Sequence, residues 1–354
     1  MPEPIDQIDT PSVLIDIDRV EANLGRAQAY ADAHDLTLRP HIKTHKLPRF
    51  ARRQVELGAI GITCQKLGEA EVMADAGIED ILLPYNLIGA EKLHRLRLLN
   101  SRVRLAVTAD SSFTIEGYAG TFADTAQPLR VLVECDTGMG RCGVQTPAEA
   151  IALARQITAS PGLVFGGLMT YPPAGQPEKA REILAAMVAA LTDAGLPPET
   201  ISTGGTPDLW AAHETRIATE YRPGTYIYLD RFQVSKGVGT LDDCALTVLT
   251  TVVSRPTADR AIIDAGSKAL TSDLLGLSGY GLVVGYPDAV ITGLSEEHGT
   301  IDLSASAKKP AIGERIRIIP NHACPVSNLF DRIHLVSGGH VVATERVEAR
   351  GRVD

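Results

Sequence analysis

The stretch Val13-Leu14-Ile15-Asp16-Ile17-Asp18-Arg19 decides between two folds, because an apolar run passes directly into an amphipathic segment. Apolar runs of strand length that alternate with helical patterns of about 10–15 residues indicate βαβ units and a parallel sheet. An open, doubly wound sheet that binds a dinucleotide should carry GxGxxG in its first such turn. The turn at residues 16–19 has no glycine. We therefore favour a closed barrel over the open sheet.

Similar apolar runs recur up to about residue 230, each followed by an amphipathic stretch. Gly58, Gly77 and Gly195 stand where three of these predicted helices end, as is common for C-terminal caps. Roughly eight repeats predict an α/β chain with a (β/α)8 TIM-type barrel. The predicted strands are 13–17, 37–39, 59–63, 80–84, 103–108, 131–134, 164–170 and 200–202, with 225–228 as a further candidate. The predicted helices are 19–33, 47–57, 67–76, 90–98, 147–158 and 177–194.

The pattern changes after about residue 235. Short strand-like runs follow one another, separated by polar or Gly/Pro turns and without long helical patterns. Such spacing is typical of an all-β domain. We therefore predict a barrel over residues 10–235 and a C-terminal all-β domain over residues 236–354, on which residues 1–9 could also pack.

Composition limits the class of partner. The 354 residues carry a net charge of −9, and no cluster of Lys and Arg is long enough for a nucleic-acid surface. Five cysteines, an odd number with no CxxC pair, argue for a reducing compartment without a disulfide framework. The first residues lack the pattern of a signal peptide, and no apolar run reaches about 18 residues. We expect a cytoplasmic protein that binds neither nucleic acid nor membrane.

The first motif with chemical potential is RPHIKTHK at residues 39–46, which follows a predicted barrel strand. Catalytic groups of such barrels lie at the C-terminal ends of strands. An amine among other cations would have a lowered pKa, and this suits Lys43 to Schiff-base formation. A solvated basic loop, or one that binds an anion, would give the same pattern.

The second motif is STGGTP at residues 202–207, directly after another predicted strand. Its glycines let backbone N–H groups approach an anion closely, and its hydroxyls add further donors. Loops at this position of a barrel commonly bind phosphate. We expect a phosphate site here.

The third motif is His322-Ala323-Cys324, which we expect to be extended, so that residues i and i+2 share one face. An imidazole beside a thiolate forms half of a divalent metal site and leaves positions open for water and substrate. A buried structural cysteine beside a hydrogen-bonded histidine is the alternative. Trp210 and His213, on a predicted helix, are interpreted as packing residues.

RPHIKTHK, STGGTP and PNHAC (residues 320–324), in this order and spacing, resemble the D-threonine aldolase and D-serine dehydratase family of fold-type III pyridoxal phosphate enzymes. The resemblance covers essentially the whole chain. It implies an alanine-racemase-like barrel with a C-terminal β domain, in a homodimer. It also implies that Lys43 is the Schiff-base lysine and that His322 and Cys324 bind a divalent metal (Zn²⁺, Mn²⁺ or Mg²⁺) beside the 3-hydroxyl of a D-amino acid.

On this resemblance the catalytic residues are Lys43, His322 and Tyr171. The residues implied to contact pyridoxal 5′-phosphate are Lys43, Gln65, Arg141, Tyr171, Thr203, Gly204, Gly205, Thr206 and Tyr226. An aldolase deprotonates the hydroxyl and breaks the Cα–Cβ bond, which releases glycine and an aldehyde. A dehydratase removes the Cα proton, with Lys43 as the base, and expels the hydroxide to give a 2-oxo acid and ammonia.

Two further stretches bear on which reaction occurs. MTYPP (residues 169–173) and CPVSNLFD (residues 324–331) resemble the aldolases, so we favour D-threonine and related D-3-hydroxy amino acids as substrates. Cys324 stands where the best-known aldolase pattern has Asp. This departure resembles the dehydratases that act on D-serine or D-3-hydroxyaspartate, and a thiolate favours zinc over manganese. An amino-acid racemase, a non-catalytic pyridoxal phosphate carrier and a binding module remain as rivals. A metal-binding pair in an added β domain suits neither the racemase nor the carrier.

Overall fold

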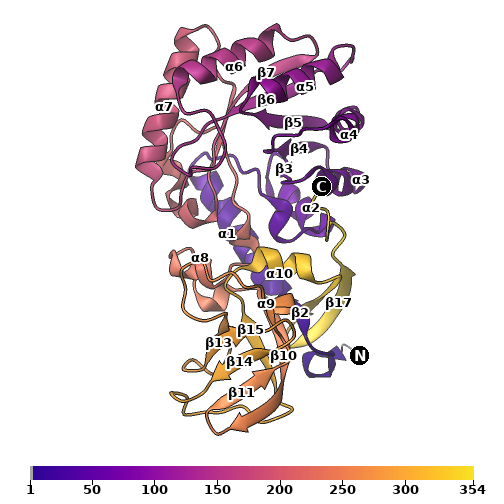
Figure 1. The fold of residues 1–354 in the computed structure, drawn as a ribbon, viewed down its shortest axis with the longest axis vertical. Coiled ribbons are helices and arrows are strands. Elements are labelled where there is room, and N and C mark those ends of the chain that lie inside the picture. The colour runs from indigo at the N-terminus through magenta and orange to yellow at the C-terminus, as the bar shows by residue number, and fades with distance from the viewer. Residues whose placement is uncertain (1–2) are drawn as a thin grey trace. The chain divides into compact units, whose positions relative to one another are not determined.

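The computed structural model describes residues 3–354, and its contacts divide the chain into two compact units (Figure 1). The barrel unit contains residues 27–43, 47–224 and 352–354. The β unit contains residues 1–26, 44–46 and 225–351. Both units therefore include parts of the chain that are far apart in sequence. The predicted ranges 10–235 and 236–354 differ from these units mainly at the N-terminal end and at residues 225–235.

The barrel unit is built on seven parallel strands paired in sequence order from β3 to β9. Single parallel bridges join Leu38 to Tyr221 of β9 and His41 to Thr63 of β3, so the extended segment 38–41 closes the ring as its eighth member. The strands are β3 (Ile62–Thr63), β4 (Asp80–Leu83), β5 (Arg104–Ala109), β6 (Leu129–Glu134), β7 (Leu163–Met169), β8 (Thr200–Thr203) and β9 (Glu220–Tyr221).

Amphipathic helices follow the strands, and Figure 1 shows α4 to α7 along the outside of the sheet. Their starts are fixed by local chemistry. The hydroxyl of Thr146 accepts from the N–H of Glu149, Glu149 caps in return, and Pro147 occupies the first turn of α6. The helices are α1 (Ile17–Ala33, which runs from the β unit into the barrel unit), α2 (Pro48–Leu57), α3 (Leu67–Asp75), α4 (Ala90–Asn100), α5 (Ser112–Phe122), α6 (Pro147–Ala159) and α7 (Pro177–Asp193).

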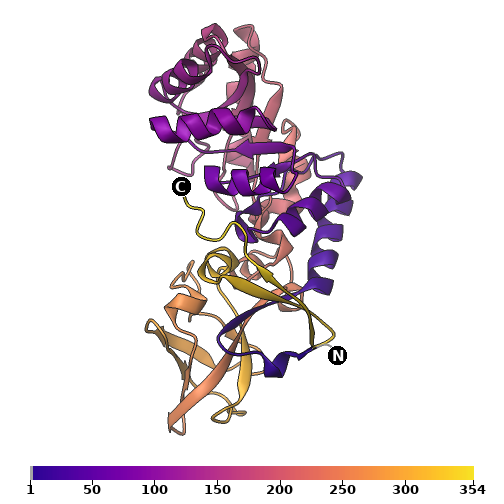
Figure 2. The same ribbon diagram turned by 90° about the vertical axis from the view of Figure 1, so that its right-hand side faces the viewer.

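The β unit is one ten-stranded sheet in the order β1-β17-β16-β2-β10-β11-β14-β13-β12-β15. An additional pairing of β15 with β10 closes six of these strands into a small antiparallel barrel. All pairs are antiparallel except β2 with β16, which lie side by side in Figure 2. The strands are β1 (Glu3–Pro4), β2 (Ser12–Asp16), β10 (Leu246–Thr257), β11 (Arg260–Ile263), β12 (Leu282–Val283), β13 (Val290–Leu294), β14 (Gly299–Asp302), β15 (Arg315–Ile319), β16 (Arg332–Ser337) and β17 (His340–Arg346).

The predicted fold class is confirmed, but two predicted barrel strands were wrong. The run 13–17 forms β2 and pairs with β10 and β16 in the antiparallel sheet. Val13, Leu14 and Ile15 are all buried, so the run looks like a strand of a parallel barrel, which is also buried on both faces. The candidate run 225–228 forms a 3₁₀ turn, η4 (Thr225–Ile227), instead of a strand.

Two elements of the barrel were not predicted. Strand β9 is only two residues long, and α5 has neither a strong apolar stripe nor a basic last turn.

Among the described residues, no helix has the length and apolar character needed to span a bilayer.

Candidate active site

Lys43 lies in η2 (Ile42–Thr44), immediately after the segment 38–41 of the barrel. Its backbone N–H donates to Nδ1 of His41 over 3.4 Å. Nδ1 is then the acceptor, so Nε2 carries the proton and donates to Oε1 of Gln65 over 3.0 Å. The amide nitrogen of Gln65 in turn donates to the carbonyl of Pro84 over 3.3 Å. The predicted cofactor contact Gln65 thus fixes the backbone turn that carries Lys43.

Tyr171 follows the end of β7 and brings several of the predicted residues together. The Lys43 Nζ lies 6.0 Å from the centre of the Tyr171 ring, and the Arg141 guanidinium carbon lies 5.0 Å from it. A Cβ on Gly205 would stand 3.2 Å from the ring, so this glycine also lies against it. The sequence could not show that Lys43, Arg141 and Gly205, which are far apart along the chain, meet at one tyrosine.

The predicted phosphate loop continues from β8 into η3 (Thr206–Glu214). Gly204 has φ +92°, and a Cβ there would lie 2.1 Å from the ring of Tyr221, so only glycine fits. The Tyr221 hydroxyl donates to the carbonyl of Gly205 over 2.9 Å, and the N–H of Gly224 donates to Oγ1 of Thr206 over 3.0 Å. These contacts fix the backbone of the loop, and its role in binding phosphate stays a prediction.

Arg222, which was not predicted from the sequence, supports this loop from inside the barrel. Its guanidinium donates to Oγ of Ser202 over 2.6 Å and to the carbonyl of Thr170 over 2.7 Å. Burial lowers the pKa of Arg222 to about 10. In the sequence, Arg222 is recognisable only as an arginine before Pro-Gly. That pattern does not show that its side chain is buried and donates to the carbonyl of Thr170.

The loop after β6 holds Arg141 in place through the carboxylate of Asp136. This carboxylate accepts from the N–H of Gly138 over 2.8 Å and from the N–H of Gly140 over 3.1 Å. The hydroxyls of Thr137 and Thr170 are 2.8 Å apart and tie the loop to the residue before Tyr171. The backbone of the loop is thus ordered, which limits where the guanidinium of Arg141 can go.

Glu134 ends β6 below this loop and is almost fully buried. Burial raises the pKa of Glu134 to about 7, although the positive charges of Arg141 and Arg222 oppose this rise. A carboxyl whose pKa is raised to about 7 therefore lies near enough to exposed Arg141 and buried Arg222 to feel both positive charges.

In the β unit, the predicted conformation of the His-Ala-Cys segment was wrong. His322 is the N-cap of α10 (Ala323–Leu329) and Cys324 lies in its first turn, so the segment is not an extended strand. Asp230 fixes this helix start, because its carboxylate accepts from the N–H of Ala323 and from the N–H of Gln233, each over 2.9 Å. Burial raises the pKa of Asp230 to about 6.

The two side chains nevertheless interact, because the contact with Cys324 is among the causes that raise the pKa of His322. Nδ1 of His322 lies 2.7 Å from Oδ2 of Asp273. Burial acts to lower the pKa of His322, but its contacts with Cys324 and Asp273 outweigh burial and raise the pKa to about 9. Cys324 Sγ also lies 3.2 Å from Oγ1 of Thr44, which follows Lys43 in the sequence.

The sequence also predicted a role for each of Tyr226, His213 and Trp210. Tyr226 is buried in η4 of the β unit, and its contact with the cofactor phosphate stays a prediction. His213 and Trp210 pack against Tyr30: Nδ1 of His213 lies 2.5 Å from the tyrosine hydroxyl, and the Trp210 ring meets it edge-on. Both therefore have the structural role expected for them.

The chain is similar over its whole length to known proteins. The alanine racemase N-terminal domain model matches residues 15–231, and a putative serine dehydratase domain model matches residues 245–336. D-threonine aldolase of an Arthrobacter species is 35% identical over 99% of this chain and 94% of the relative. D-threo-3-hydroxyaspartate dehydratase of Delftia sp. strain HT23 is 34% identical over 96% of this chain and 97% of the relative.

Among solved structures, D-threonine aldolase from Filomicrobium marinum superposes with a TM-score of 0.93 at 33% identity, covering 100% of this chain and 99% of the other. The likeness thus extends over both the barrel and the β unit. The chain therefore belongs to the D-threonine aldolase and D-serine dehydratase family, a family of lyases built on the alanine-racemase-like fold.

Proposed function

We propose that the protein cleaves D-threonine and related D-3-hydroxy amino acids to glycine and an aldehyde, with pyridoxal 5′-phosphate and a divalent metal. The observation that carries this proposal is the pairing of His322 with Cys324, with Asp273 on the imidazole. A racemase has no use for such a pair, whereas a lyase that acts on a 3-hydroxyl can use a metal to bind it. The D-threonine aldolases among the relatives support the same reaction.

The barrel unit fits pyridoxal 5′-phosphate. The cradle at Gly204 and Gly205 leaves space where a Cβ would collide with Tyr221 or press on Tyr171, and it suits the phosphate. Lys43 would hold the cofactor covalently, and Arg141 with Tyr171 would contact its ring. When bound, this cofactor supplies an electron sink for the bond broken at Cα.

The β unit fits a divalent metal. An imidazole and a thiol are ligands for zinc, and a carboxylate on the second ring nitrogen is the usual partner of a metal-binding histidine. Among residues 3–354 no group of three or more His, Cys, Asp or Glu forms a metal cluster, so His322 and Cys324 would leave positions open to water and substrate. A metal there would lower the pKa of the substrate hydroxyl.

The protein's own residues then have distinct tasks. His322 and Cys324 orient the 3-hydroxyl, Asp273 keeps the imidazole in one tautomer, and Arg141 supplies a fixed positive charge beside Tyr171. Loss of the hydroxyl proton is the step that an aldolase needs before the Cα–Cβ bond breaks. We further propose that the protein acts as a cytoplasmic homodimer, which light scattering after size-exclusion chromatography would test.

Dehydration of D-serine or D-3-hydroxyaspartate is the second candidate, and Cys324 is the observation that favours it. The Delftia dehydratase is 34% identical. A solved structure of a D-threo-3-hydroxyaspartate dehydratase is a cysteine-to-alanine variant in the metal-free form, which suggests that the dehydratase binds a metal. In this reaction Lys43 would take the Cα proton and the metal would assist the departure of hydroxide.

Turnover of D-threonine and D-serine decides between the two. Protein loaded with pyridoxal 5′-phosphate is assayed before and after EDTA, and again after Zn²⁺ or Mn²⁺ is added. We expect glycine and acetaldehyde from D-threonine, lost with the chelator and restored by the metal. Ammonia with a 2-oxo acid, and no glycine, would assign the dehydratase reaction instead. Turnover that is unchanged by EDTA would contradict the metal role of His322 and Cys324.

A further inference from the structure

A cavity of about 320 Å³ lies at the amino-terminal ends of the barrel strands, opposite the ends that carry the candidate active site. Its wall includes the first residues of four strands: Asp80 of β4, Arg104 of β5, Thr200 of β8 and Glu220 of β9. Small-molecule sites commonly have volumes of about 300–1,000 Å³. The cavity is therefore large enough for a ligand, and the proposed function makes no use of it.

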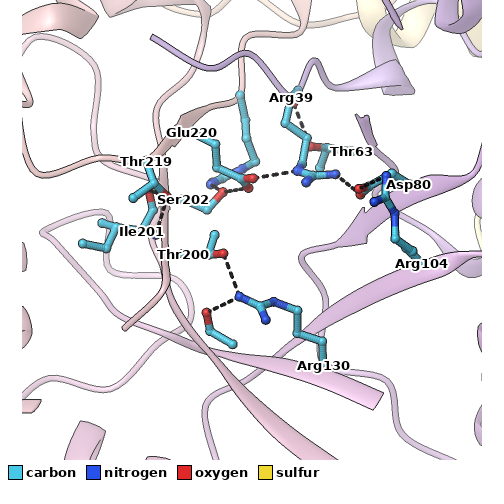
Figure 3. Close-up of polar contacts among 12 residues, drawn as sticks. Arg39, Thr63, Asp80, Arg104, Arg130, Thr200, Ile201, Ser202, Thr219 and Glu220 are labelled. Carbon is cyan, nitrogen blue, oxygen red and sulfur yellow. Dashed lines mark hydrogen bonds and ion pairs between the residues drawn. The ribbon is translucent and has the colours of Figure 1, made fainter. Parts of the chain in front are cut away.

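Three guanidinium groups and two carboxylates surround this space, as Figure 3 shows. Both carboxylates are already engaged. Arg39 donates to Oδ1 of Asp80 over 2.5 Å and to Oε2 of Glu220 over 2.7 Å, and Nη2 of Arg104 lies 3.1 Å from Oδ2 of Asp80. With Arg39, Arg104 and Arg130 against two carboxylates, the wall carries one positive charge more than it carries negative charges.

Arg104 and Arg130 hold the donors that a ligand would use. A guanidinium has five N–H donors. Within the described residues Arg104 makes one ion pair, to Asp80, and its side chain is 77% exposed. Arg130 donates to the carbonyl of Gly166 and to Oγ1 of Thr200, and its remaining ion pair, with Glu199, involves a carboxylate outside the cavity wall. Figure 3 shows both side chains facing the common space.

The rest of the wall indicates the body of the ligand. Leu82, Leu105 and Leu132 line the cavity with apolar side chains. Asn100 is only 2% exposed; its amide nitrogen donates to the carbonyl of Gln127, whereas its Oδ1 has no hydrogen-bond partner within residues 3–354. A carboxylate has no donor to offer this oxygen, so water, not the ligand, would have to meet it.

We propose that this cavity is a second binding site, for a small monocarboxylate with a short apolar body. Two guanidiniums with spare donors match the planar, bidentate geometry of a carboxylate. The lining residues alone carry one net positive charge, which matches a monoanion better than phosphate, whose charge approaches −2 at neutral pH. A bound anion would compete with Glu199 for Arg130. The leucine side chains suit a hydrocarbon body and disfavour a second charged group.

Propionate is a suitable probe, titrated calorimetrically into the full-length protein loaded with pyridoxal 5′-phosphate. We expect saturable binding of propionate and about tenfold weaker binding by Arg104→Gln and by Arg130→Gln, because each loses a charged hydrogen bond. The exposed Arg104 has little packing to lose, so its variant should fold. Propionamide, which has the same shape without the charge, should not bind.

The matched control is Arg102→Gln, since Arg102 is exposed, pairs with Asp75 and does not line the cavity. It should bind propionate as the unaltered protein does. A second control, Arg141→Gln, should also keep propionate binding. Equal affinity in Arg104→Gln and the unaltered protein, loss of binding in Arg141→Gln, or phosphate that binds as tightly as propionate would each overturn the proposal.

Discussion

The imidazole of His322 is held by the carboxylate of Asp273, with Nδ1 and Oδ2 2.7 Å apart. The two residues are 49 positions apart in the sequence, and the hydrogen bond fixes which ring nitrogen faces the carboxylate. The other nitrogen is thereby left basic and suited to a metal. The fold of the β unit, by placing Asp273 beside His322, thereby prepares the histidine for the proposed metal.

Asp273→Ala should weaken binding of Zn²⁺ or Mn²⁺ by about 10–100-fold, because the histidine loses the group that orients it. Metal affinity can be measured by competition with a chelating dye, without reference to turnover. Asp273→Asn retains an acceptor for Nδ1, so its metal affinity should lie between those of Asp273→Ala and the unaltered protein. The exposed Asp288→Ala is the matched control. Unchanged affinity in Asp273→Ala would show that His322 does not ligate the metal.

Asp136→Ala should loosen the loop that carries Arg141, since three backbone and side-chain donors lose their acceptor. We expect kcat/KM for the D-amino acid to fall about tenfold or more, which corresponds to roughly 1.4 kcal/mol or more of lost transition-state stabilisation. Asp136→Asn keeps one acceptor oxygen and should retain more activity. Equal kinetics for the alanine variant and the unaltered protein would show that Arg141 needs no such support.

Arg39→Met should destabilise the barrel strongly, because it leaves Glu220 and Asp80 without their shared partner in a largely buried position. Removing one partner of a buried ion pair lowers the free energy of unfolding by about 3–5 kcal/mol. Urea unfolding measures the change in the free energy of unfolding. The double variant Arg39→Met/Glu220→Gln should recover part of the loss. A loss below about 1 kcal/mol in Arg39→Met would contradict a structural role for this network.

Glu134 should make the stability of the protein depend on pH. Its pKa is raised by burial to about 7 in the folded state, against 4.5 as the ordinary value. Between these values only the folded state holds the proton, so this residue's contribution to stability falls as pH rises from about 4.5 to 7 and is constant above. A shift of this size corresponds to about 3 kcal/mol.

Glu134→Gln removes this contribution, so its advantage in melting temperature over the unaltered protein should grow between pH 5 and pH 8. Differential scanning calorimetry across this range is the measurement. The exposed Glu116→Gln should show no such growth. Identical pH profiles for Glu134→Gln and the unaltered protein would mean that burial does not hold the proton on Glu134.

The local pattern of the chain was sufficient to predict much of the fold. Alternating apolar runs and amphipathic stretches gave six strands of the barrel and six of its helices, because burial on a strand or a helix face imposes a period on the sequence. The same reasoning failed at residues 13–17. A central strand of an antiparallel sheet and a strand of a parallel barrel can both be buried on two faces, so their sequences look alike.

The sequence by itself determined which chemical groups the protein possesses and where they stand along the chain: a lysine after the first barrel segment, a glycine-rich turn after β8, and a histidine two residues before a cysteine. Only the tertiary structure decided which of these groups lie close to one another. It brings Lys43, Arg141 and Gly205 to Tyr171, sets Asp273 against His322, and collects three arginines at the opposite end of the barrel. The physical reason is that motifs reflect short-range backbone requirements, whereas these contacts join residues tens to hundreds of positions apart, and their positions follow from how the strands pair and close.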